Sequence, residues 1–396
     1  MPDYRSPLLD WPGAVPAESP DAGIALHYGD PLGEQRRAAE EAGLLDLGNR
    51  DVLQVPGEDR LGWLHAICSQ HLAGLSDGAS TEALVLSPTG HVEQHWQLTE
   101  LGGRVWLDTE PGAADEVLAY LLKMRFLKRV EPVVVTADFG MLAVTGPAGA
   151  EVLGRAGLPV PDAAALALPG GGLIRRLGGR YELIVPRSEL AAVAAAVRDS
   201  GASPAGAWPA AALRVTARRP RLGVDTDHRT LPHEAGWIHV AVHLDKGCYR
   251  GQETVARVQN LGKPPRRLVL LHLSGDSEQL PAAGSPVERD GRQVGFVGTA
   301  VQHYEYGPVA LAIVKRAVGP DDRLVVAGHT AALDPADAEA ELPTGFAGRA
   351  RPPARPGGRV TGPAAGPAPP LGPTARSGGQ PAPRPRSPAA SPRRRG

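Results

Sequence analysis

The chain of 396 residues is long enough for two or three domains, and its 42% hydrophobic composition is sufficient for a sizeable core. Its two cysteines, Cys68 and Cys248, are too few for a disulfide framework, so a reducing compartment is expected. No segment approaches the roughly 18–20 uninterrupted apolar residues that cross a bilayer, which argues against a membrane protein.

The net charge of −1 conceals an uneven distribution along the chain. Residues 343–396 contain ten arginines and no acidic residue, whereas residues 1–342 carry 32 basic and 43 acidic side chains. The composition of the basic tail cannot bury enough apolar surface to offset the entropy of the chain. We therefore expect residues 343–396 to be disordered and to make no specific contact with nucleic acid.

Residues 1–20 are rich in proline and show no apolar periodicity, which predicts a loose lead-in. They also lack the basic start and the apolar stretch of a secretory signal peptide. A cytoplasmic protein is therefore expected.

Residues 21–262 mix helical and strand-like patterns in chain order. Apolar spacing predicts helices over 34–44, 59–67, 115–127 and 190–197, and strands over 52–55, 83–86, 92–98, 105–107, 133–136, 141–145 and 173–185. No regular alternation of strand and helix is present, and no G-x-G-x-x-G follows a strand. The pattern favours an α+β architecture over a doubly wound sheet.

After Pro264-Pro265 the pattern changes to strands separated by Gly and Pro, with no convincing helix. Residues 263–342 are therefore predicted to form a small β-barrel or sandwich domain.

The most specific feature of the sequence is the octapeptide Lys246-Gly247-Cys248-Tyr249-Arg250-Gly251-Gln252-Glu253. Nearby cations favour the reactive thiolate form of a cysteine, so Lys246 and Arg250 suggest a functional Cys248, with His239 or His243 as a possible base. A small buried thiol is the alternative for Cys248, and core packing is expected for Cys68. The nearby histidines lack the spacing of a zinc helix, so no metal site is predicted.

Three runs of residues carry a family resemblance. The first is Arg219-Pro220-Arg221-Leu222-Gly223-Val224-Asp225, the second is Pro232-His233-Glu234-Ala235-Gly236, and the third is the octapeptide. Together they resemble the YgfZ proteins, which are related to the aminomethyltransferase (T-protein) of glycine cleavage. The similarity covers residues 22–333 and omits both ends.

This resemblance implies a three-domain cloverleaf around a central channel for tetrahydrofolate, and a role in assembling or repairing iron–sulfur proteins. Cys248 would be the functional thiol, and Asp225, Lys246, Tyr249, Gln252 and Glu253 would bind the cofactor. A carboxylate such as Asp225 can accept two parallel hydrogen bonds from a pterin, and basic residues can attract its glutamate tail. The alternatives are a turn aspartate for Asp225 and a helix-start residue for Glu253. The implied partners are folate and iron–sulfur assembly proteins or their client enzymes.

Two departures from the transferase put aminomethyl transfer in doubt. The octapeptide has Cys248-Tyr249-Arg250 where the enzyme has Asp-Phe-Ile, and Glu93-Gln94 stands in place of paired aspartates. The alternative function is nevertheless that of a tetrahydrofolate-dependent aminomethyltransferase in which Glu93 acts as the general acid–base. A scaffold without a ligand is the third interpretation.

Overall fold

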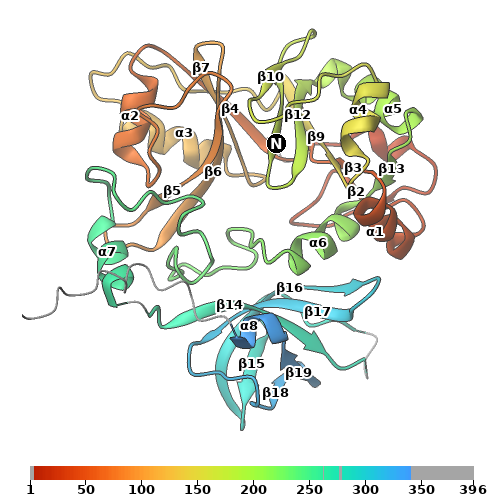
Figure 1. Cartoon of the computed structure of the whole chain (residues 1–396), viewed down its shortest axis with the longest axis vertical. Helices are drawn as coiled ribbons and strands as arrows, with labels where there is room; N and C mark the ends of the chain where they lie inside the picture. The colour runs from red at the N-terminus through yellow and green to blue at the C-terminus, as the bar shows by residue number, and fades with distance from the viewer. Residues whose placement is uncertain (1–3, 262, 276–278, 340–396) are drawn as a thin grey trace, which may run out of the picture. The chain divides into compact units, whose positions relative to one another are not determined.

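A computed structural model describes residues 4–261, 263–275 and 279–339 of the chain. The predicted disordered tail, residues 343–396, lies outside the described residues. Within them the chain forms two large sheets, a two-stranded sheet, a closed barrel and the segments that join these parts (Figure 1).

The first sheet has five strands and carries two helices on one face. Alternating apolar residues of the strands pack beneath these helices around the fully buried Trp96. The strand order is β5 (Ser80–Leu86), β6 (Val92–Leu101), β7 (Arg104–Thr109), β4 (Asp51–Pro56) and β8 (Val133–Val134), and the helices are α2 (Arg60–Ile67) and α3 (Ala114–Lys123).

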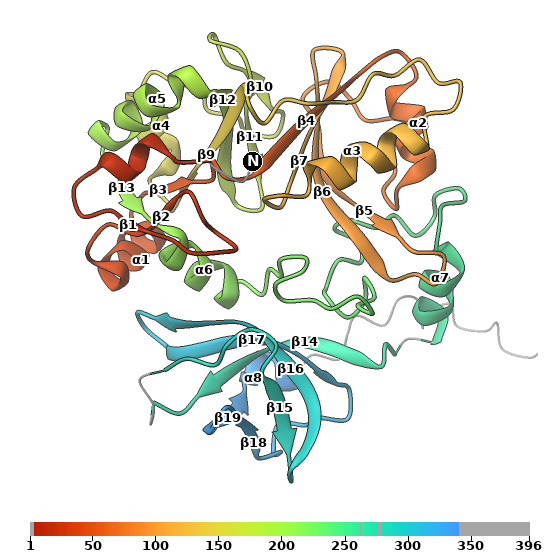
Figure 2. The ribbon, with the colours of Figure 1, turned by 180° about the vertical axis from the view of Figure 1, so that it is seen from behind.

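The second sheet has six strands in the order β10 (Leu166–Ala167), β11 (Leu173–Leu177), β12 (Arg180–Pro186), β9 (Phe139–Thr145), β3 (Gly43–Asp46) and β13 (Ser203–Ala205). Helices α4 (Gly149–Arg155) and α5 (Arg187–Asp199) pack on one face through an apolar cluster (Figure 2). Helix α1 (Pro31–Glu40) precedes β3 and contacts it. The predicted helix over 34–44 therefore begins earlier and stops at Glu40, because residues from Gly43 onward are needed for the buried strand β3.

A buried ion network joins the two sheets. The Arg175 guanidinium of β11 is fully buried and pairs with Asp108 of β7 and with Glu182 of β12. Such a network is favourable only when every charge has partners, and here each member is hydrogen-bonded. The inner faces of the sheets also meet through Val52, Trp106 and other apolar residues.

The expected loose lead-in is wrong for residues 4–20. They contain a short 3₁₀ helix (Pro7–Asp10) and strand β1 (Val15–Pro16), which pairs with β2 (Ala25–His27). Leu8 is buried in the apolar cluster of the second sheet, and the buried Ser6 hydroxyl donates to Asp46. Tertiary burial of a few residues orders a proline-rich segment that shows no periodicity of its own.

Helix α6 (Ala207–Thr216), a long loop and helix α7 (Gln252–Leu261) connect the sheets to the barrel. The closed barrel follows the order β14 (Arg266–Leu273), β17 (Gly307–Lys315), β16 (Arg292–His303), β15 (Pro286–Arg289), β18 (Leu324–Val326) and β19 (His329–Leu333), and β19 pairs back with β14. Helix α8 (Pro335–Glu339) follows it. The predicted α+β class with a C-terminal barrel is confirmed.

Within the described residues, no helix has both the length and the apolar character that crossing a membrane requires.

Candidate functional site

Lys246 anchors the octapeptide to the end of helix α2. Its ammonium group donates to the backbone carbonyls of His65, of Cys68 at 2.5 Å and of Gln70 at 3.2 Å. The C-terminus of a helix has free carbonyls and a partial negative charge, so a buried cation is well placed there. Lys246 therefore has a structural role that explains its presence in the motif.

The glycines of the octapeptide allow it to lie directly against the β5–β6 turn. Gly251 has a φ of +80°, and a Cβ atom there would lie 2.5 Å from the carbonyl oxygen of Ser87. Arg250 reinforces this contact by pairing with Glu93 at 2.8 Å. Any side chain at position 251 would push the loop away from the turn.

Cys248 and Tyr249 are neighbours on this anchored loop, but the first is exposed to solvent and the second is buried. Cys248 is exposed, and within the described residues no hydrogen bond joins it to His239 or His243. Tyr249 is buried in an apolar cluster with Leu86 and Trp237, and burial raises the pKa of its hydroxyl to about 12. Cys68, by contrast, is buried as expected, and burial raises the pKa of its thiol to about 11.

Gln252 and Glu253 form the first turn of α7. The Gln252 amide donates to the carbonyl oxygen of Lys246 at 3.3 Å, which closes the loop onto itself. Glu253 is exposed, in the position where an acidic side chain complements the positive end of the helix.

Asp225 is fully buried, and both of its carboxylate oxygens are in use. One oxygen accepts from the backbone N–H and the hydroxyl of Thr299, each at 2.7 Å. The other accepts from Arg214 at 2.6 Å and from the backbone N–H of Arg221 at 2.7 Å. Four donors of the protein fill the acceptor positions of the carboxylate, so the predicted pterin contact at Asp225, which stays a prediction, requires a ligand to displace one of them.

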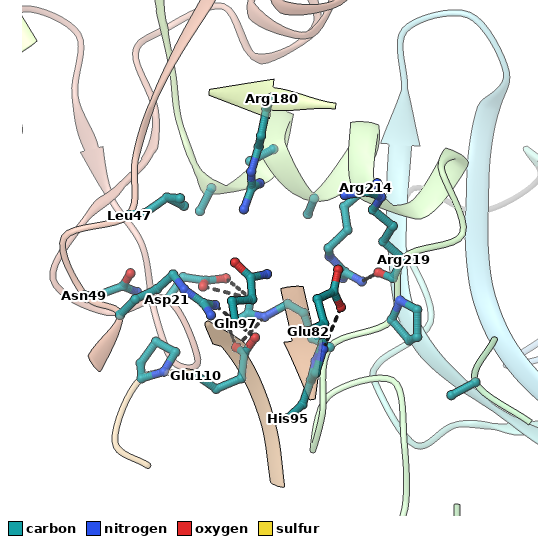
Figure 3. Close-up of a pocket in the computed structure, with 18 of the residues that line it drawn as sticks. Asp21, Leu47, Asn49, Glu82, His95, Gln97, Glu110, Arg180, Arg214 and Arg219 are labelled. Carbon is teal, nitrogen blue, oxygen red and sulfur yellow. Dashed lines mark hydrogen bonds and ion pairs between the residues drawn. The ribbon is translucent and has the colours of Figure 1, made fainter. Parts of the chain in front are cut away.

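A cavity of about 310 Å³ opens where the two sheets and helix α6 meet (Figure 3). Among the residues that line it, Glu82 of β5 faces inward together with His95 and Gln97 of β6, and Arg180 of β12 points in from the opposite side. The indole of Trp237 also lines the cavity, with its ring centroid 4.9 Å from that of His95. The wall thus combines a carboxylate, an amide, an imidazole and an aromatic surface.

Glu82 and His95 form a pair within this wall. The Nε2 atom of His95 lies 2.8 Å from a carboxylate oxygen of Glu82. Burial alone would raise the pKa of Glu82, but the hydrogen bond and charge of His95, followed by the charge of Arg219, hold it below its usual value. Glu82 is therefore a carboxylate at neutral pH and an acceptor for ligand N–H groups.

A second carboxylate cluster lies on the cavity wall around Arg221, which pairs with Asp21 at 2.9 Å and with Glu110 at 2.7 Å. Burial alone would raise the pKa of Glu110, but the charges of Arg50 and Arg221 lower it to about 2. These carboxylates are neutralised by their partners and hold the wall together.

None of the six predicted site residues lines this cavity, although all six belong to the described part of the chain. Asp225 is linked to the cavity wall through Arg214 and the backbone of Arg221, and the octapeptide is linked to it through the apolar cluster that Tyr249 shares with Trp237. Sequence reasoning missed Glu82, His95 and Gln97. A signal for two of them was present, because polar residues recur at every second position of the strand, at Glu93, His95 and Gln97.

Glu93 itself does not line the cavity and is paired with Arg250. In the described ranges, no three or more His, Cys, Asp or Glu side chains are arranged to hold a metal ion.

Comparisons with known proteins agree on the fold. Residues 30–163 match the family model of the GCVT N-terminal domain. The protein is 26% identical to an aminomethyltransferase of Symbiobacterium thermophilum, over 77% of this chain and 88% of the relative. It is 27% identical to an aminomethyltransferase of Chromobacterium violaceum, over 80% of this chain and 90% of the relative.

A protein of Arabidopsis thaliana named as a chloroplastic transferase is 25% identical over 64% of this chain, and the match spans only 60% of the plant protein. Among solved structures, the glycine cleavage system aminomethyltransferase T of Bartonella henselae superposes with a TM-score of 0.74 at 23% identity, covering 82% of this chain and 94% of that one. The chain therefore has the fold of the glycine-cleavage aminomethyltransferases.

Proposed function

We propose that this protein binds a tetrahydrofolate in the cavity between its two sheets and acts as an accessory protein in the assembly or repair of iron–sulfur clusters. Cys248 is its functional thiol. The aminomethyltransferase fold supports the folate part of this proposal, and the resemblance of the octapeptide to the YgfZ proteins supports the iron–sulfur part.

The chemistry of the cavity wall is the observation that carries the folate part. A reduced pterin presents several N–H donors along one edge of a flat ring, and the ionised Glu82 and the amide oxygen of Gln97 are acceptors on the wall. Trp237 offers an aromatic surface for the ring. A volume of about 310 Å³ lies at the small end of the usual range for ligand pockets, so the ring fits inside while the tail extends toward the opening.

Bound tetrahydrofolate supplies the capacity to carry a one-carbon unit. The residues of this chain bind and orient it: Glu82 is fixed by His95, and Trp237 is held in the apolar cluster beneath the octapeptide. The hydrogen-bonded Glu82–His95 pair also lines the cavity, where it is placed to exchange a proton with a ligand.

The accessibility of Cys248 supports its role as the functional thiol. The thiol is exposed on a loop that Lys246, Gly251 and the Arg250–Glu93 pair hold in place. A fixed, accessible thiol can reach a cluster or a partner protein without a change in the fold. An iron–sulfur cluster would be cargo here, since the two cysteines of the chain cannot fill a four-cysteine site.

Calorimetric titration with tetrahydrofolate under reducing conditions tests the folate part. The unmodified protein should bind, and Glu82→Gln should weaken binding roughly tenfold or more, because it removes a charged acceptor from the wall. Glu131→Gln, which changes a carboxylate outside the cavity, is the matched control. Binding that is absent, or equal in the protein and in Glu82→Gln, would refute the assignment.

Cys248→Ala should bind tetrahydrofolate as the unmodified protein does and should fail to restore iron–sulfur enzyme activity in cells that lack the protein. If Cys248→Ala restored iron–sulfur enzyme activity in these cells, a role for this thiol would be excluded.

Aminomethyl transfer is the second candidate, favoured by the relatives that carry that name over most of their length. Glu93 lies outside the cavity, whereas Glu82 lines it and is a carboxylate available for such a reaction. Turnover with a lipoylated carrier protein that is abolished by Glu82→Gln and unaffected by Cys248→Ala would establish this activity instead of the accessory role.

A further inference from the structure

Six arginines line the cavity, and five of them are held by carboxylates of the protein. Arg50 and Arg221 pair with Glu110, Arg180 with Glu182, Arg214 with Asp225, and Arg218 with Asp334 and Asp337. Arg219 differs from the other five. Its side chain has no hydrogen bond or ion pair to any residue that the structure describes.

The position of Arg219 is nevertheless defined. Arg214 donates to its backbone carbonyl at 2.6 Å, and Arg214 is in turn fixed by the buried Asp225. The Arg219 guanidinium reaches the turn between β11 and β12, where a Cβ atom on Gly178 would lie 1.8 Å from its Nη1 atom. The absence of a side chain at Gly178 thus leaves room for the Arg219 guanidinium.

The charge of Arg219 helps to lower the pKa of Glu82, but the two side chains form no hydrogen bond or ion pair. The carboxylate of Glu82 is hydrogen-bonded to His95, and its interaction with Arg219 is through space alone. Arg219 is therefore a cation with a fixed backbone, an exposed head and five donors that no described residue uses.

We infer that Arg219 binds a carboxylate group of the cavity's ligand, at the opening between the β11–β12 turn and β5. A planar guanidinium matches a carboxylate in a bidentate arrangement, and the other five arginines are already occupied by such groups. This inference rests on the proposed function and deepens it. The reduced ring lies inside against Glu82 and Gln97, and a carboxylate of the glutamate tail lies outside against Arg219.

A comparison of two ligands tests the inference. Tetrahydrofolate carries the glutamate tail, whereas a methyl-substituted tetrahydropterin has the same reduced ring and no carboxylate. Arg219→Gln should weaken tetrahydrofolate binding roughly three- to tenfold, the effect expected for a charged pair that stays partly in solvent, and should leave tetrahydropterin binding unchanged. Arg219→Lys, which keeps the charge and loses the bidentate geometry, should give an intermediate loss.

Arg229→Gln is the matched control, because Arg229 is an exposed arginine of the same connecting segment and does not line the cavity. If Arg219→Gln weakened the binding of both ligands equally, or of neither, the role of Arg219 would be overturned. The proposal that the cavity binds folate would still stand. Failure of the unmodified protein to bind either ligand would instead overturn the proposed function, and the role of Arg219 with it.

Discussion

At the scale of single residues, burial gives side chains of the same type different roles. Cys68 and Cys248 are the two cysteines of the chain, and one is packed in the core of the first sheet whereas the other is exposed. Asp46 and Asp225 are both buried aspartates, but only Asp225 is paired with an arginine. Sequence patterns predicted the buried Cys68 from its helical apolar neighbours, whereas the burial of Asp225 depends on Thr299, which is far away in the chain.

The two thiols should differ sharply in reactivity. Iodoacetamide at pH 8 should modify one thiol per folded chain, Cys248, and both thiols after denaturation. Cys68 is excluded from solvent, and burial raises the pKa of its thiol to about 11, so it is neither accessible nor ionised. Mass spectrometry of the alkylated protein measures this, and labelling of folded Cys248→Ala would contradict it.

Asp46 should make stability fall as the pH rises. Burial raises the pKa of Asp46 from 3.8 to about 6, despite the opposing hydrogen bonds from Ser6 and Gly48. Between these two values the folded state holds a proton that the unfolded state has released, so the contribution of Asp46 to stability is fully present below pH 4 and is lost as the pH passes 6. This loss amounts to about 3 kcal/mol.

Asp46→Asn mimics the protonated carboxyl and removes the titration. Its free energy of unfolding, measured by denaturant titration from pH 4 to pH 7, should therefore rise relative to that of the unmodified protein. A difference between the two proteins that stays constant over this range would contradict the shifted pKa.

At the scale of elements, local patterns located most of the helices and strands but not their exact ends. Helix 59–67 was predicted nearly as it is found, from the spacing of Leu61, Leu64 and Ile67. Helix α6 was missed, because its alanines carry little amphipathic signal, and it is stabilised by packing on α1 and β16. The octapeptide was recognised from its residues, but its attachment to α2 and to the β5–β6 turn depends on contacts that no local pattern contains.

Lys246→Met should destabilise the protein by about 2 kcal/mol. The substitution keeps the length of the buried side chain but leaves three carbonyls near the end of α2 without their charged donor. Chemical denaturation measures the loss. Lys263→Met, at an exposed lysine beyond α7, is the control and should change stability by no more than about 0.5 kcal/mol. Equal effects of the two substitutions would show that Lys246 does not anchor the loop.

At the scale of the whole described chain, composition and spacing predicted the α+β class and the barrel, since these depend on strand patterns repeated along the sequence. The position of the cavity could not be predicted in this way. It is formed by residues between Asp21 and Val240 that come together only when both sheets and α6 have packed. The family resemblance supplied the expectation of a central ligand channel and predicted contacts at Asp225 and the octapeptide, whereas the cavity is lined by Glu82, His95 and Gln97.

Asp225 links the connecting segment to the barrel, so its loss should affect the whole molecule. Asp225→Ala should lower the free energy of unfolding by about 3 kcal/mol, because Arg214 and Thr299 lose a buried acceptor. Asp321→Ala, at an exposed position of the barrel, should have little effect. Unchanged stability of Asp225→Ala, combined with weaker folate binding, would show that Asp225 contacts the ligand after all.

The central claim is that the ligand cavity is the one lined by Glu82, His95 and Gln97, and that Cys248 acts elsewhere. A crystal structure of the protein with tetrahydrofolate tests it most directly. The account predicts the reduced ring within hydrogen-bond distance of Glu82 and Gln97, the tail at Arg219, and Cys248 free of the ligand. A ring bound against Asp225 or against the thiol of Cys248 would contradict it.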